Sequence, residues 1–285
     1  MIITAARRRI DGPIPWILAV VAVAWLALII GAPLATILVQ AASKGLATFL
    51  DAFKEPDALA AIRLTLLVAA IAVPLNAAFG LAAAWSIAKF DFRGKSLLLT
   101  LIDLPLSMSP VVSGLVWVLL FGARGWFGPW LEAGGIKIIF AAPGIVLGTI
   151  LVTVPLVARE LIPLMTEQGA EEELAAVTLG AGGWTTLRRV TIPNVRWALL
   201  HGVLLCNARA MGEFGAVSVL SGHIRGLTET LPLHVEALYN DYDFVGAFAA
   251  ATLLAGLAIV TLIAKAALER LGSGDHNHAS EAPRS

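Results

Sequence analysis

Between two long apolar segments, the chain reads EEELAAVTLGAGGWTTLRRVTIP from Glu171 to Pro193. Three acidic residues open an Ala-rich stretch, as is typical of a helix N-terminus, where carboxylates face the positive end of the helix dipole. Gly180 then fits a helix stop, because glycine readily adopts the left-handed conformation that ends many helices. A second short helix is predicted over Trp184–Val190, and Pro193 is expected to close it. The stretch therefore predicts two short helices joined by a glycine turn, which we call the hairpin (Glu171–Pro193).

The chain that carries the hairpin is too apolar for a soluble core. Of 285 residues, 58% are hydrophobic and 14% are charged, and the mean hydropathy is +0.84. Soluble domains carry roughly 25% charged residues. A helix needs about 20 mostly apolar residues to cross a bilayer. The segments that satisfy this requirement are Trp16–Val39, Leu64–Ala88, Leu97–Phe121, Ile138–Ala158, Trp197–Leu220 and Phe244–Ala264. We predict an all-α, polytopic membrane protein with about six transmembrane helices.

The distribution of lysine and arginine predicts the orientation of these helices. Most of these residues lie at the two chain ends and in the loops on the same side, including the long connection over about residues 166–196 that contains the hairpin. Cytoplasmic loops are enriched in positive residues. Both termini and the hairpin are therefore expected in the cytoplasm.

One transmembrane domain is expected over residues 16–270. Residues 1–15 are predicted to form a cytoplasmic N-terminal segment, and the Gly-, Ser- and His-containing tail over 271–285 is predicted to be disordered. His276 and His278 lie in that tail, and two histidines in a flexible segment are too weak a pattern to predict a metal site. The lone Cys206 lies in an apolar stretch, which predicts neither an intrachain disulfide nor a cysteine-rich metal motif.

The sequence lacks the motifs of common enzyme classes. A phosphate-binding loop needs Gly-x-x-x-x-Gly-Lys-[Ser/Thr], but Lys89 occupies the first glycine position before Gly94-Lys95-Ser96. Neither His-Glu-x-x-His nor Gly-x-Ser-x-Gly occurs. We expect no enzyme activity, ATP hydrolysis included, and no cofactor. A formal net charge of +0 gives no reason to expect nucleic-acid binding.

The hairpin resembles the EAA loop of ABC importer permeases, whose pattern is Glu-Ala-Ala, three residues, Gly, nine residues, then Ile-x-Leu-Pro. Aligned on the glycine, the matching positions are Leu174, Ala175, Ala176, Gly180, Val190, Ile192 and Pro193. Leu174 stands at the usual glutamate position, and Glu173 lies one residue earlier. The resemblance implies a type I importer permease fold whose hairpin is seated in a cleft of a cytoplasmic ATPase. The alternative is an amphipathic hairpin that packs on the chain's own cytoplasmic face.

Other stretches resemble the oxyanion permeases, and most closely the W-type permeases of sulfate/thiosulfate importers. They are Ile102–Val112, Asn207–Gly215, Ser221–Gly226 and Leu231–Tyr242. The resemblance implies a multi-pass permease in a bacterial inner (plasma) membrane. It also implies three kinds of partner: a second permease subunit that forms a heterodimer with the chain, an ABC ATPase dimer and a periplasmic sulfate/thiosulfate-binding protein. Two alternatives stay open, a molybdate/tungstate permease and an ion-coupled secondary transporter.

Two ionisable residues in the fifth apolar segment are candidates for the substrate path. Charged groups at membrane depth cost roughly 2.5–3.5 kcal/mol on insertion scales, so they usually face a partner or a pathway. Arg209 and Glu213 are spaced i,i+4, which places them on one helical face, where they can pair. Either Arg209 supplies a positive field along an oxyanion route while Glu213 restrains it, or the pair is an internal staple between helices.

Hydroxyl groups in the third apolar segment are further candidates for the path. A dianion that crosses apolar surroundings needs donors to replace its water. Ser107, Ser109 and Ser113 lie near Pro105 and Pro110 and offer such donors. The alternative is that these small residues simply allow close helix packing.

Overall fold

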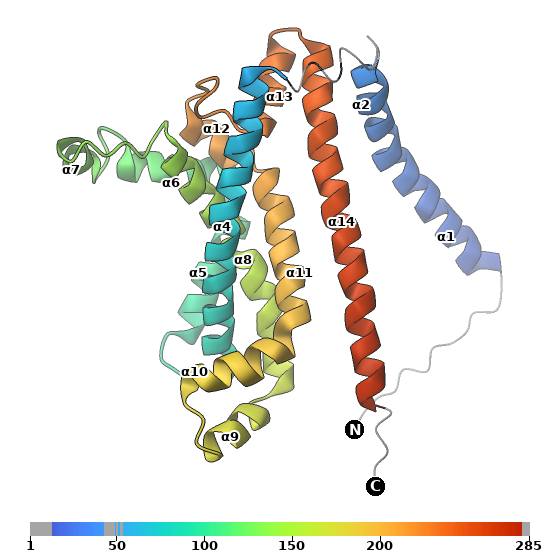
Figure 1. Cartoon of the computed structure of the whole chain (residues 1–285), viewed down its shortest axis with the longest axis vertical. Helices are drawn as coiled ribbons and strands as arrows, with labels where there is room; N and C mark the ends of the chain where they lie inside the picture. The colour runs from blue at the N-terminus through green and yellow to red at the C-terminus, as the bar shows by residue number, and fades with distance from the viewer. Residues whose placement is uncertain (1–12, 43–48, 50, 52–53, 281–285) are drawn as a thin grey trace.

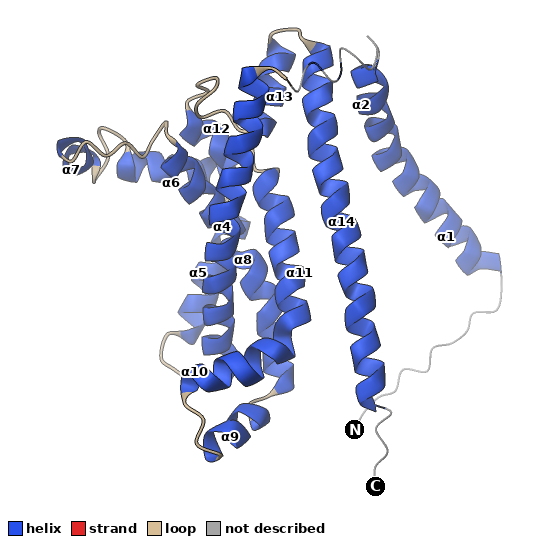
Figure 2. Ribbon diagram, viewed as in Figure 1, coloured by secondary structure: helices blue, strands red, loops and turns tan. Residues whose placement is uncertain are grey.

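The computed structural model describes residues 13–42, 49, 51 and 54–280, and every regular element in these ranges is a helix (Figure 2). The predicted all-α class is therefore confirmed for this part of the chain. In chain order the helices are α1 (Pro13–Leu26), η1 (Ala27–Gly31), α2 (Ala32–Ala42), α4 (Pro56–Lys89), α5 (Lys95–Ser107), α6 (Pro110–Phe121), α7 (Gly128–Ala133), α8 (Ala142–Gln168), α9 (Glu171–Thr178), α10 (Gly183–Thr186), η2 (Leu187–Thr191), α11 (Ile192–Met211), α12 (Gly215–Ser221), α13 (Leu231–Asn240) and α14 (Phe244–Ser280).

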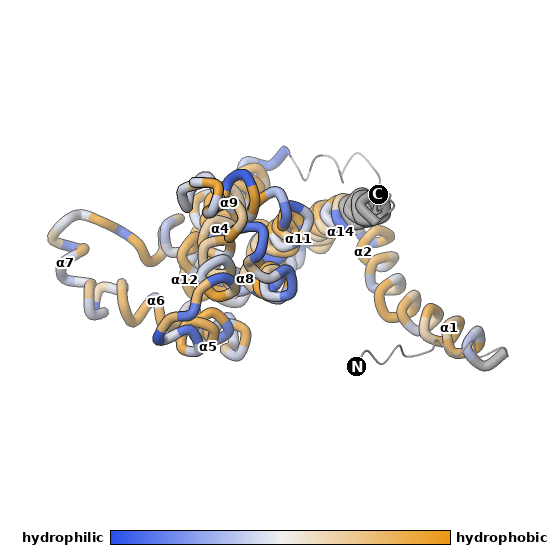
Figure 3. Tube along the Cα trace, turned by 90° about the horizontal axis from the view of Figure 1, so that it is seen from below, coloured by the Kyte–Doolittle hydropathy of each residue, from blue (hydrophilic) through white to orange (hydrophobic). Residues whose placement is uncertain are grey.

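Among the described residues, four helical stretches are long and apolar enough to cross a membrane, and the number rises to 6 if each of two bent helix pairs is one span. The four are Pro15–Gln40, Pro56–Lys89, Ala142–Gln168 and Phe244–Ala267. The first of them has a first half, α1, that diverges from the bundle, whereas its second half, α2, packs against α14 (Figure 1), and most of its residues are hydrophobic (Figure 3). Its side chains are widely exposed, with Trp16 at 76% and Trp25 at 63%. A helix that is apolar on all sides suits a lipid environment.

The predicted span Leu97–Phe121 is not one straight helix. It consists of α5 and α6, which meet at an angle of 110°. Pro110 explains the break, because a proline disfavours the helical conformation in the residue before it. Ser109 accordingly has an extended backbone, with φ −63° and ψ 134°.

The predicted span Trp197–Leu220 is also bent, by 49°, where α11 ends and α12 begins. Both bends position polar groups inside the apolar part of the molecule.

The second helix of the hairpin does not end at Pro193, so that prediction is wrong. Helix continues from Gly183 to Met211, with the wider π turn η2 immediately before the proline. In η2 the backbone amide of Ile192 donates to the carbonyl of Leu187. A π turn of this kind bends a helix without ending it, so the missing proline amide is accommodated.

The C-terminal helix is longer than the sequence predicts. Helix α14 continues to Ser280, whereas disorder is predicted from residue 271 onward. Extending an existing helix adds a hydrogen bond without a new nucleation cost, which accounts for the continuation. Of the predicted terminal segments 1–15 and 271–285, residues 1–12 and 281–285 lie outside the described residues, as do the side chains of His276 and His278.

The core is formed by α4, α8 and α11, which pack closely along their lengths (Figure 1). Small residues allow this approach, as is typical of helix packing in membranes. A Cβ atom added at Gly80 of α4 would lie 2.7 Å from the Cβ atom of Val157 in α8, and one at Gly202 of α11 would lie 3.2 Å from the Cα atom of Val157. Buried apolar side chains such as Leu161 and Met165 fill the remaining space.

A buried polar cluster joins the same three helices. The side-chain amide of Asn76 in α4 donates to the hydroxyl of Thr153 at 2.7 Å, and it lies 3.8 Å from the sulfur of Cys206 in α11. Thr153 belongs to α8 and is itself fully buried. Because unsatisfied polar groups are costly in an apolar interior, this cluster fixes the relative register of the helices.

Glycine packing in this core leads to the first prediction. We expect Gly80→Ala to destabilise the chain by about 1–3 kcal/mol, because the added methyl group overpacks a contact with α8. As a control, Gly256→Ala in α14 meets no atom within 4 Å, and we expect it to be neutral or mildly stabilising. Apparent melting temperatures in detergent measure both effects. Equal melting temperatures for the two variants would contradict the proposed close packing of α4 on α8.

Candidate functional site

The hairpin lies at one end of the helix bundle, the same end as the last residues of α14 (Figure 1). Its predicted helix–turn–helix form is present, since α9 is followed by Gly180 in the left-handed region at φ +87° and then by α10. The glycine turn is needed because other residues are strained at that φ.

The outer surface of the hairpin is rich in large apolar side chains. Leu174 is 62% exposed, Leu179 89% and Trp184 73%. Exposed apolar residues gathered at a polar end of a membrane protein mark an interaction surface. Ala175, Gly180 and Pro193 are also exposed, so several of the predicted coupling residues share this surface.

Other predicted hairpin residues face inward. Ala176, Val190 and Ile192 are half-buried. Glu173 is more enclosed: its carboxylate oxygen Oε1 lies 2.9 Å from the Nζ atom of Lys89 and accepts a hydrogen bond of 3.1 Å from the hydroxyl of Thr191. Thus Glu173 and Leu174, which compete for the glutamate position of the EAA pattern, point in different directions from α9, Glu173 toward Lys89 of α4 and Leu174 toward the exposed surface. The sequence did not predict this partner of Glu173, because nothing local to Lys89 indicates a contact with a residue more than eighty positions away.

The two helix breaks meet inside the bundle. A Cβ atom added at Gly215, the first residue of α12, would lie 2.8 Å from the Cβ atom of Pro110, the first residue of α6. One added at Gly114 of α6 would lie 2.7 Å from the carbonyl oxygen of Ala216. Glycines at both positions therefore let α6 and α12 touch through their backbones. The contact brings the predicted path residues of two separate segments to one region.

The ion pair that the i,i+4 spacing allows is present at the second break. The Arg209 guanidinium lies 3.2 Å from Glu213 Oε2, and the other carboxylate oxygen accepts a 3.0 Å hydrogen bond from the backbone amide of Ala216. The Glu213 side chain is 1% exposed, whereas that of Arg209 is 49% exposed. Glu213 therefore joins the end of α11 to the start of α12, and Arg209 keeps an open face.

The three predicted serines surround the first break but differ in their surroundings. Ser113 is fully buried and its hydroxyl donates to the carbonyl of Ser109 at 3.3 Å. Ser107 donates to the carbonyl of Leu104 at 2.8 Å, and Ser109 is exposed. Two of the three hydroxyl hydrogens are thus directed to the chain's own backbone. The hydroxyl oxygens can accept, and the Ser107 and Ser109 side chains lie open.

Two ion pairs in or beside the long apolar helices were not predicted as sites. Arg159 of α8 lies 3.2 Å from Asp103 of α5, with both side chains about half exposed, and His201 of α11 lies 2.7 Å from Glu160 of α8. The sequence signal for them was the presence of ionisable residues in or beside apolar segments, but their pairing depends on tertiary packing.

The opposite end of the bundle carries a polar loop between α12 and α13. The Nδ1 atom of buried His234 lies 3.1 Å from Glu229 Oε2. On the surface, the Arg225 guanidinium donates to Asp241, and this hydrogen bond, with the carboxylate charge, raises the pKa of Arg225 above its ordinary value. The two ends of the bundle therefore differ: the hairpin end exposes large apolar side chains such as Leu179 and Trp184, and the opposite end carries the Arg225–Asp241 ion pair.

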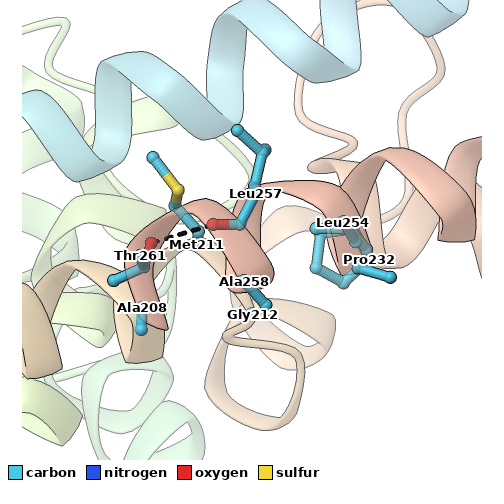
Figure 4. A pocket seen from close by; sticks show the side chains of 9 residues that line it. Ala208, Met211, Gly212, Pro232, Leu254, Leu257, Ala258 and Thr261 are labelled. Carbon is cyan, nitrogen blue, oxygen red and sulfur yellow. Dashed lines mark hydrogen bonds between the residues drawn. The ribbon is translucent and has the colours of Figure 1, made fainter. Parts of the chain in front are cut away.

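A cavity of about 310 Å³ lies between α11 and α14 but does not suit an anion (Figure 4). The residues that line it are Ala208, Met211, Gly212, Pro232, Leu254, Ala255, Leu257, Ala258 and Thr261. The single hydroxyl among them, on Thr261, donates to the carbonyl of Leu257. No group of three His, Cys, Asp or Glu side chains within the described ranges is arranged to hold a metal ion.

Comparisons with known proteins agree with this architecture. Residues 76–271 match the family model of the binding-protein-dependent transport system inner membrane component. The chain is 54% identical over 243 residues to the sulfate transport system permease protein CysW of Escherichia coli, covering 85% of this chain and 84% of that protein. It is 34% identical over 235 residues to the sulfate transport system permease protein CysT of Escherichia coli, covering 82% and 85%.

A solved structure supports the fold independently of sequence similarity. A bacterial ABC transporter involved in the import of the acidic polysaccharide alginate contains a chain that superimposes with a TM-score of 0.74 at 15% identity. The match covers 90% of this chain and 95% of that chain. The helical arrangement is therefore the fold of an ABC importer permease.

Proposed function

Because the chain belongs to the family of binding-protein-dependent transport system inner membrane components, we propose that it is a permease subunit of an ATP-driven importer of sulfate and thiosulfate. The chain is thus a multi-pass inner-membrane permease, and in this family the ATPase is a separate subunit. The observation that carries the proposal is the hairpin, which presents Leu174, Leu179 and Trp184 at the end of the bundle where a motor subunit would bind.

The hairpin acts as the contact with the ATPase. Apolar side chains on a short helix fit a groove on a partner, and the exposed positions of α9 offer them in that form. Closure of two ATPase copies around ATP then moves the hairpins of two permease subunits. The resulting shift between outward-open and inward-open states follows from the different affinities of these states for nucleotide and anion.

The partner at the membrane is a second, related permease. The similarity of the chain to the T-type permease of a sulfate transport system supports a heterodimer of two homologous subunits. A periplasmic binding protein meets the opposite end of the bundle, where the loop with Arg225 and Asp241 lies. In this arrangement both chain termini and the hairpin are cytoplasmic, in agreement with the positive-inside rule.

The anion route passes the meeting point of the two helix breaks. Irregular backbone at membrane depth is tolerated where it is buried in protein or lines a polar pathway. The open face of Arg209 attracts an anion, while Glu213 limits how tightly the anion is held. Ser107, Ser109 and Ser113 offer hydroxyl groups around the first break, which supports their place along the route.

The proposed function predicts ATP-dependent transport by the assembled complex. Vesicles that contain the chain, its partner permease and the ATPase, supplied with the binding protein, should accumulate labelled sulfate only when ATP reaches the ATPase. Unlabelled thiosulfate should compete with sulfate, and molybdate should compete weakly. Uptake by the isolated chain without ATP would indicate a secondary transporter, and stronger competition by molybdate would indicate a different oxyanion.

The hairpin turn provides a specific test of coupling. We expect Gly180→Val to reduce ATP-dependent sulfate uptake by at least about tenfold, because a β-branched residue at φ +87° costs about 1–3 kcal/mol and rearranges the turn. Space is not the limitation, since no atom lies within 4 Å of a Cβ atom added there. Gly182→Val is the matched control, because Gly182 is equally open but has φ −73°. If the Gly180 variant retained both uptake and ATPase association, the hairpin assignment would be wrong.

The serine positions are tested together. Alanine at Ser107, Ser109 and Ser113 should lower sulfate uptake at least about fivefold while the complex assembles normally, because donors and acceptors along the route are lost. Thr252→Ala serves as a control, since its hydroxyl bonds to the carbonyl of Phe248 within α14, away from both breaks. Uptake equal to the control would remove the serines from the route and leave them as packing residues.

A further inference from the structure

One ion pair connects the hairpin to the end of a membrane-spanning helix in the same chain. Lys89 is the last residue of α4, and its Nζ atom lies 2.9 Å from Glu173 Oε1 in α9. Lys89 also donates to the carbonyl of Gly169, the residue that follows α8. The hydroxyl of Thr191, in the π turn that leads into α11, donates to the same oxygen of Glu173 at 3.1 Å. Three side chains, those of Lys89, Glu173 and Thr191, thus join α4, α8, α9 and the start of α11.

The pair is shielded from water although it lies at a polar end of the molecule. The side chains of Lys89 and Glu173 are 5% and 14% exposed. At the same end, Lys95 and Asp91 also pair, at 3.3 Å, but their side chains are 35% and 101% exposed. Exposed pairs contribute little to structure, whereas loss of one partner from a shielded pair leaves an uncompensated charge. Lys89 and Glu173 are therefore a specific connection, and Lys95 and Asp91 are a suitable reference.

The connection reaches the core of the bundle. Helix α4 packs against α8 and α11 along the closely packed surface that contains Gly80 and Asn76. A displacement of α9 that keeps the ion pair intact must therefore move the ends of α4 and α8 with it. A second hydrogen bond also connects α9 to a membrane helix, since the side-chain amide of Asn194 in α11 donates to the carboxylate of Glu172.

We propose that the Lys89–Glu173 pair is the intramolecular link that converts movement of the hairpin into movement of α4 and α8. Both are positioning residues: Leu174 faces outward toward the ATPase, and Glu173 faces inward and holds α9 to the membrane helices. The inference rests on the proposed function, because it specifies how the hairpin acts within an ATP-driven importer. It also assigns to Glu173 a partner within its own chain.

The number of sulfate ions transported per ATP hydrolysed tests this link in the reconstituted complex. The neutral variants Lys89→Met and Glu173→Gln should each lower this ratio at least about tenfold, while the ATPase stays bound and hydrolyses ATP. Lys89→Arg retains the charge and the donor and should stay within about twofold of wild type. Lys95→Met, which removes a cation from the same end of the molecule, should leave the ratio unchanged.

The double variant Lys89→Met/Glu173→Gln distinguishes one link from two independent roles. If the residues act as a pair, the double variant should be no worse than the worse single variant, because the second change removes nothing further. The proposal is overturned if the single variants keep the wild-type ratio, or if their losses multiply in the double variant.

Should a single variant fail to assemble because of its unpaired charge, the neutral double variant decides. A wild-type ratio in that double variant overturns the link, and a lowered ratio supports it. Failure of the proposed function is a separate result, since it would appear in the wild-type complex as sulfate uptake that does not depend on ATP.

Discussion

The backbone of this protein must satisfy its own hydrogen-bonding groups, because the hydrocarbon layer offers none. That constraint accounts for the all-helical architecture, and it also governs the two places where helices break at membrane depth. At the second break, the carboxylate of Glu213 accepts the amide hydrogen of Ala216 and pairs with Arg209. At the first, the carbonyl oxygen of Ser109 accepts hydrogen bonds from both the backbone amide and the hydroxyl of Ser113. The breaks then press against each other through Gly114 and Gly215, so that protein covers the irregular backbone of each.

The distribution of apolar residues was sufficient to predict most of the fold. Span positions follow from the length of an apolar run, which is a local property of the sequence, and the helices found agree with them to within a few turns. The bends could not be predicted in the same way. The run Leu97–Phe121 is apolar on both sides of Pro110, so hydropathy alone does not distinguish a bent pair from a kinked helix. The prediction that the helix ends at Pro193 was wrong for a related reason. A π turn accommodates the proline, and nothing in the local sequence indicates that turn.

In the candidate sites too, features that depend on local sequence were predicted, and features that depend on tertiary contacts were not. The glycine turn and the acidic start of α9 were predicted, since both depend on backbone conformation and helix dipoles. The inward orientation of Glu173 was not, because it depends on Lys89 at the far end of another helix. The Arg209–Glu213 pair could be predicted from the sequence because its i,i+4 spacing is about one helical turn. Its second role, in holding the start of α12, required knowledge of where the helix breaks.

The continuous helix from the hairpin into the membrane has a mechanical consequence. Helix α11 contains 20 residues and, at about 1.5 Å per residue, spans about 30 Å. A rigid rod of that length turns a tilt of about 10° at the π turn into a sideways shift of about 5 Å at its other end. Arg209 lies near that other end. A small rotation at the hairpin would thus displace the Arg209 guanidinium by more than the length of a hydrogen bond.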